Sequence, residues 1–69
     1  MTLHENAKFI CERLVQDYIN NGRCTIYPFW DVMKIITHSL EIGAINQFHA
    51  KRYCHQMHIS FAEMMTADN

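Results

Sequence analysis

Apolar residues recur at helical spacing along three segments of this chain, and this pattern restricts the fold more than any other feature. In the first segment Thr2 and Glu5 have the spacing of a capping box, and Asn20, Asn21 and Gly22 form a stop signal. The apolar face between them consists of Leu3, Ala7, Ile10, Cys11, Leu14, Val15 and Tyr18. The pattern predicts one long amphipathic helix with this face toward the core.

Two further helices and a short fourth one are predicted downstream. Pro28 suits the first turn of the second helix, and Gly43 ends it. Its apolar face is Phe29, Val32, Met33, Ile36 and Leu40. The third helix is predicted over residues 45–57, with Ala50, Tyr53, Cys54 and Met57 on its apolar face. Ser60 and Glu63 repeat the capping-box spacing and predict a short helix from Ser60. Residues 23–27 are interpreted as an extended loop, because a single strand would have no partner.

These elements predict an all-α fold: a three-helix bundle with a short C-terminal helix, formed by one domain over residues 1–69. The hydrophobic fraction of 49% argues against disorder. A domain this short buries only about 60% of the surface of its unfolded chain, so a monomer is expected to be marginally stable. Proteins of this size often gain stability from a disulfide, a metal or an oligomeric contact.

Three large apolar residues fall on the polar sides of their helices: Phe9, Ile35 and Phe48. Trp30 lies at the edge of the apolar face of its helix. Single exposed apolar residues are common, and a helix in a bundle can contact two neighbours. Together, however, the four favour a second buried surface, formed in a homodimer or with another protein. We therefore predict these four residues as apolar anchors, with a charged rim of Lys51, Arg52 and His55.

No residue pattern predicts catalysis or a cofactor. Cys54 and His58 have the i, i+4 spacing of two metal ligands on a helix, but no second ligand pair accompanies them. A buried thiol and surface histidines are the favoured interpretation, so we expect no metal, no cofactor and no enzymatic activity. The odd cysteine count, with Cys11 and Cys24 as the others, and the lack of a secretory signal favour reduced thiols in the cytoplasm.

Two kinds of partner remain open. A protein-binding regulator, adaptor or inhibitor is favoured, a type that phages and mobile elements also encode. The alternative is a nucleic-acid-binding regulator, because the helix over residues 45–57 follows a Gly43 turn as in a helix-turn-helix arrangement. Gln47, Lys51, Arg52 and His55 would face the nucleic acid. The net charge of −1 argues against this alternative, and so do polar His38, His49 and Arg52 at positions that are usually apolar in a helix-turn-helix.

A membrane partner is not expected, because no apolar run approaches the roughly 18 residues of a membrane helix.

Overall fold

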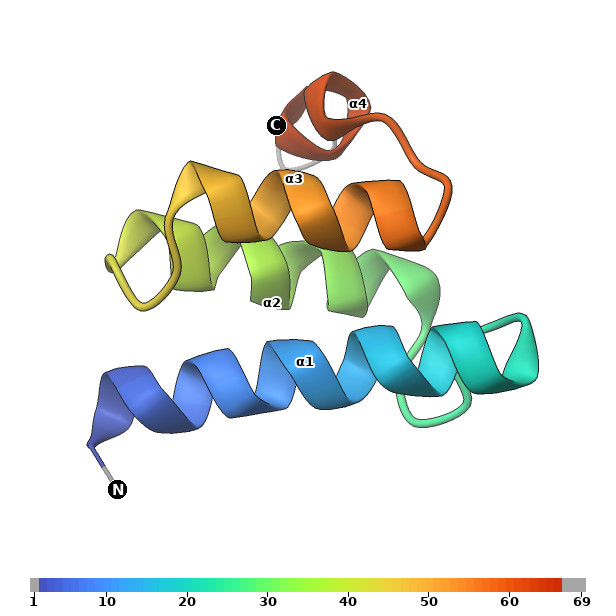
Figure 1. Cartoon of the computed structure of the whole chain (residues 1–69), viewed down its shortest axis with the longest axis horizontal. Coiled ribbons are helices and arrows are strands. Elements are labelled where there is room, and N and C mark those ends of the chain that lie inside the picture. The colour runs from blue at the N-terminus through green and yellow to red at the C-terminus, as the bar shows by residue number, and fades with distance from the viewer. Residues whose placement is uncertain (1, 67–69) are drawn as a thin grey trace.

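The computed structural model describes residues 2–66, and this part of the chain is all-α, as predicted. It contains α1 (Leu3–Asn21), α2 (Phe29–Glu41), α3 (Gln47–Gln56) and α4 (Phe61–Thr66). Figure 1 shows α2 running antiparallel to α1, and α3 returning in the direction of α1. These three helices contact one another, and α4 packs on α2 and α3. Residue 1 and residues 67–69, which the predicted domain includes, lie outside the described part.

Most helix ends follow the sequence signals. The Thr2 hydroxyl accepts a hydrogen bond from the backbone N–H of Glu5 at 3.1 Å, and Gly22 ends α1 in the left-handed conformation with φ +73°. Pro28, however, precedes α2 instead of lying in its first turn. Its ψ of 150° is extended, while its carbonyl accepts the N–H groups of Asp31 and Val32. Proline thus still marks the start of this helix, but as its N-cap, and α2 begins one residue later than predicted.

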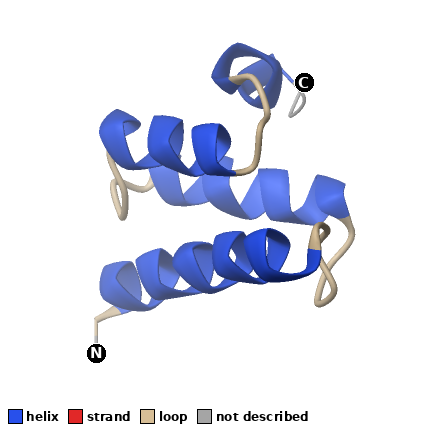
Figure 2. Ribbon diagram, turned by 45° about the vertical axis from the view of Figure 1, so that its right-hand side comes forward, coloured by secondary structure: helices blue, strands red, loops and turns tan. Residues whose placement is uncertain are grey.

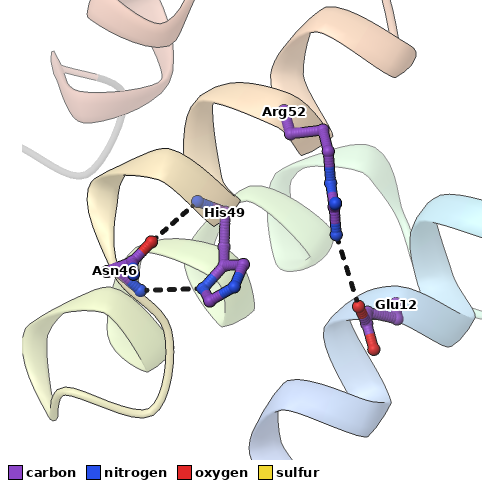
Figure 3. A network of polar contacts seen from close by, with 4 residues as sticks. All are labelled: Glu12, Asn46, His49 and Arg52. Carbon is purple, nitrogen blue, oxygen red and sulfur yellow. Dashed lines mark hydrogen bonds and ion pairs between the residues drawn. The ribbon is translucent and has the colours of Figure 1, made fainter.

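The third helix begins at Gln47, two residues later than predicted, because Asn46 caps it. The Asn46 side-chain oxygen accepts the backbone N–H of His49 at 2.9 Å. In return, the backbone N–H of Asn46 donates to Nδ1 of His49 at 3.3 Å (Figure 3). This reciprocal pair is a capping box made from residue types other than the usual Ser/Thr and Glu. It requires an unprotonated Nδ1 on His49.

The core lies where α1, α2 and α3 meet, and α4 adds Met64 to it. All four residues predicted for the apolar face of α3 are buried, and so are Cys11, Leu14 and Val15 of α1. Leu3 and Ile10 are exposed, at 75% and 37%, although they share the apolar face of α1 with these residues. The prediction of one continuous buried face is therefore wrong for the N-terminal half of α1. In that half, Ala7 and Ile10 line an open groove with residues of α2.

Within residues 2–66, the buried side-chain nitrogen and oxygen atoms have hydrogen-bond partners, with one exception. The Cys11 thiol donates to Oγ of Ser39 at 3.2 Å, and the Ser39 hydroxyl donates to the carbonyl of Ile35 at 2.8 Å. The Tyr53 hydroxyl is buried without a hydrogen-bond partner among the described residues. Burial raises its pKa, and the negative charge of Glu12 raises it further. Burial also raises the pKa of the Cys11 and Cys54 thiols, which keeps both protonated near neutral pH.

Asp17 fixes the loop between α1 and α2. Its carboxylate accepts the backbone N–H of Thr25 at 2.6 Å and the Thr25 hydroxyl at 2.7 Å. These hydrogen bonds, the backbone one first, lower the pKa of Asp17. Residues 23–27 form a loop and not a strand, as predicted, but the loop bends at several residues and is not extended throughout. Its attachment to α1 sets the path by which the chain enters α2.

Candidate protein-binding surfaces

Four large apolar side chains are exposed around Pro28, at the junction of this loop with α2. They are Ile26, Tyr27, Phe29 and Trp30, which we call the aromatic surface, and each is between 38% and 61% exposed. Figure 2 shows this loop at one end of the molecule, away from the N-terminus. The hydrogen bonds between Asp17 and Thr25 hold the start of the surface, and the Phe29 ring lies 6.3 Å from the ring of Tyr18. The surface is therefore attached to α1 at two points.

The area that these side chains expose can be compared with that of known surface patches. An aromatic side chain carries about 150–250 Å², so its three aromatic residues, roughly half exposed, offer on the order of 300 Å². The largest apolar patch on a monomeric protein is typically about 300–600 Å² and often functional. One partner in a standard protein interface contributes about 800 Å². The aromatic surface could thus form the apolar centre of an interface with a polar surround.

A second apolar feature is a groove between α1 and α2, which we call the α1–α2 groove. Its volume is about 330 Å³, and its lining residues are Ala7, Ile10, Lys34, Ile35, His38 and Ser39. The walls are almost entirely apolar, while the exposed side chains of Lys34 and His38 lie at the rim. The Ser39 hydroxyl is already engaged with Cys11 and the Ile35 carbonyl. The floor therefore offers no free hydroxyl to an occupant.

The four predicted apolar anchors lie in different places. Phe9 and Phe48 are exposed, at 54% and 69%, and Trp30 belongs to the aromatic surface at 61%. Ile35 is half-buried, lines the α1–α2 groove and packs against the core. Its position on the polar side of α2 thus has a local explanation, because it lines the groove together with Ala7 and Ile10 of α1.

The predicted charged rim is also divided. The Lys51 ammonium lies 5.5 Å from the centre of the Phe61 ring of α4, whereas the Arg52 guanidinium lies 3.7 Å from the Glu12 carboxylate of α1 (Figure 3). His55 is exposed. Glu12 and Ile10 are two positions apart, about 200° around α1, so the ion pair and the groove lie on opposite sides of this helix. The contacts therefore assign Ile35 and Arg52 to separate faces.

Sequence reasoning missed two sets of surface residues. Ala7 and Ile10 line the groove although their spacing placed them in the core. Ile26, Tyr27 and Phe29 were assigned to a connector or to the core. A signal for the second set is present in the sequence: five successive residues, from Ile26 to Trp30, carry no charge, and their only hydrogen-bonding side-chain groups are the tyrosine hydroxyl and the tryptophan indole N–H. No comparable signal marks the groove, because periodicity does not show which neighbour covers a face.

The described residues contain no arrangement suited to metal binding. No group of three or more His, Cys, Asp or Glu side chains converges in residues 2–66. Of the predicted candidate pair, the Cys54 sulfur is buried 3.5 Å from the Met64 sulfur, and His58 is exposed. Among the helices of this region, none has the length and hydropathy of a membrane span.

Comparisons of this chain with protein-family models, with curated proteins and with solved structures found no match.

Proposed function

We propose that this chain is a small, non-enzymatic protein-binding regulator, adaptor or inhibitor that acts by occupying a surface of its partner. The observation that carries the proposal is the aromatic surface. Four neighbouring apolar side chains, three of them aromatic, are exposed around one proline. Tyr and Trp are enriched at the centres of protein interfaces, because they bury a large area with few rotatable bonds.

A second copy of the chain is the partner that can be tested first. In a symmetric dimer each aromatic surface would contact its own copy, so on the order of 600 Å² of aromatic area would leave the water. At about 25 cal/mol per Å² this contributes about 15 kcal/mol, against association costs of about 4–15 kcal/mol. A dissociation constant of 1 µM needs about 8 kcal/mol net, which lies within this range. We therefore expect a reversible, concentration-dependent dimer.

Trp30 makes this dimer directly measurable, because it is the single tryptophan of the sequence. Its fluorescence emission should shift to shorter wavelength, and its quenching by iodide should fall, as the protein concentration rises through the micromolar range. Light scattering over the same range should show the mass increase from one subunit toward two. Tyr27→Ser should weaken both changes, whereas Phe48→Ser, which changes an exposed ring on α3, should leave them intact.

The outcomes separate self-association from binding to another protein. A monomeric mass together with constant Trp30 emission would rule out the dimer. A pull-down from nuclease-treated lysate, repeated with Trp30→Ser, then tests a different partner. A specific protein recovered by the wild type and lost with Trp30→Ser supports the proposal, and equal recovery with both contradicts it.

Nucleic-acid binding is the less favoured function. Two positive groups of the face that would contact nucleic acid, Lys51 and Arg52, already have partners within the chain. Surface ion pairs of this kind are weak, at about 0–1 kcal/mol, so salt dependence is the more direct criterion. Affinity for nucleic acid falls steeply with salt, while an apolar protein contact responds little.

A further inference from the structure

We propose that the α1–α2 groove binds an acidic amphipathic helix of a partner protein. This inference concerns a different surface from the one that carries the proposed function. It rests on the shape of the groove, on the hydrogen bonds beneath it and on the charges at its rim.

The shape and the floor of the groove define an apolar, elongated occupant. Ala7 and Ile10 line the groove, and Leu3, which lies one turn before Ala7 on the same side of α1, is 75% exposed. The apolar row that starts outside the groove at Leu3 and ends in it at Ile10 is about 10 Å long. Ile35 lies on the α2 side of the groove. An apolar groove between two neighbouring helices can bind a third helix. That helix would place apolar residues at positions i, i+4 and i+7 in the groove. The Ser39 hydroxyl already has hydrogen-bond partners within the chain. A polar group of the occupant would therefore lose its hydrogen bonds to water in the groove without gaining one to Ser39.

The rim selects the charge of the occupant. Lys34 and His38 are four residues apart on α2, and both are exposed beside the furrow. None of the described residues that line the groove is an aspartate or a glutamate. Lys34 carries a positive charge, and His38 has a ring N–H donor in either protonation state. Carboxylates one turn apart on the flank of the bound helix would face both groups, which makes an acidic helix the complementary occupant.

A pair of synthetic peptides tests this inference. The first is a helix of about 16 residues with leucines at i, i+4 and i+7 and glutamates along one flank. The second is identical except for lysines in place of the glutamates. Fluorescence anisotropy measures binding of each labelled peptide, and shifts of the backbone amide NMR signals locate it. The acidic peptide should bind about tenfold more tightly, and the shifts should cluster at residues 3–10 and 34–39.

Two variants with one control locate the interaction. Lys34→Glu replaces attraction by repulsion at an exposed position, so affinity for the acidic peptide should fall about fivefold or more. Arg23→Glu makes the same charge change in the exposed loop before α2 and should have little effect. Ala7→Leu places a larger side chain within the groove. It should reduce binding of the acidic peptide at least as strongly as Lys34→Glu does. Far-UV circular dichroism is the control for folding of this variant.

Several results would overturn the inference. Equal affinity for the two peptides would remove the charge selectivity, and absence of binding by both at about 1 mM would remove the site. Loss of peptide binding in Trp30→Ser but not in Ala7→Leu would place the peptide on the aromatic surface. A dimer disrupted by Ala7→Leu would identify a second copy as the occupant. The proposed function is tested separately by the variants at Tyr27 and Trp30, so the two proposals can fail independently.

Discussion

Truncation of two residues on the same face of α1 tests whether the α1–α2 groove is open in solution. Leu14 is 2% exposed and Ile10 is 37% exposed, although both belong to one apolar face. Leu14→Ala removes side-chain atoms from a closed core and leaves a cavity, which costs about 3–5 kcal/mol. Ile10→Ala removes a partly solvated side chain beside an open furrow. Burial contributes about 0.8 kcal/mol per CH₂ group, and this variant leaves no closed cavity. Ile10→Ala should therefore lower the free energy of unfolding by about 1.5 kcal/mol.

Urea denaturation followed by far-UV circular dichroism measures both losses. A small domain has only about 5–15 kcal/mol of total stability, so Leu14→Ala should remove a large share of it, and Ile10→Ala a small one. Each kcal/mol lowers the melting temperature of a domain of this size by about 4–8 °C, which provides a second readout. Equal losses for the two variants would refute the reasoning, because a neighbour would then have to cover Ile10 in solution.

Three further predictions concern the interior and the helix ends. Tyr53→Phe should stabilise the protein by about 1 kcal/mol in the same denaturation assay, because it removes a buried hydroxyl that has no partner; a loss of stability would mean that this hydroxyl donates a hydrogen bond, for which Glu12, whose charge raises the pKa of Tyr53, is the candidate acceptor. Asn46→Ala should cost about 1 kcal/mol by removing the cap of α3, and an unchanged urea midpoint would contradict that role. The lowered pKa of Asp17 contributes stability that is present above the unfolded pKa of about 3.9 and is lost as the pH falls through the folded value. Asp17→Asn should therefore be less stable than the wild type near neutral pH and approach it in acid, as thermal unfolding at several pH values would show; a difference that is independent of pH would contradict this.

Under the two proposals, this small chain would have two separate ways to contact proteins. The aromatic surface consists of Ile26, Tyr27, Phe29 and Trp30, and it suits a centre of apolar contact. The α1–α2 groove has the positive charge of Lys34 and the imidazole of His38 at its rim, and both would select an acidic partner. If the aromatic surface forms a symmetric dimer, each dimer would carry two grooves. Two linked grooves would then increase the apparent affinity for a partner that presents two acidic helices, without any new contact.

The structure changes the interpretation of the predicted binding residues. Phe9 and Phe48 are exposed as the helical pattern indicated, because a large residue opposite a helix's core face has no neighbour to bury it. Trp30, at the edge of the apolar face of α2, is exposed as well. Ile35 was grouped with them, but it lies against α1 and belongs to the groove. Lys51 and Arg52 are adjacent in sequence, yet they lie 100° apart on α3 and contact different helices, α4 and α1.

Local sequence by itself determined the number, type and approximate ends of the helices. Thr2, Gly22, Pro28 and Ser60 act through hydrogen bonds and backbone angles within a few residues, so their effect can be predicted without the rest of the chain. The apolar spacing of α3 likewise identified its buried face, which contacts three other helices. Only the tertiary structure decided which part of the apolar face of α1 is covered. Leu3, Ala7, Ile10 and Leu14 have the same periodicity, but burial depends on where α2 and α3 lie, and no local interaction of α1 specifies that.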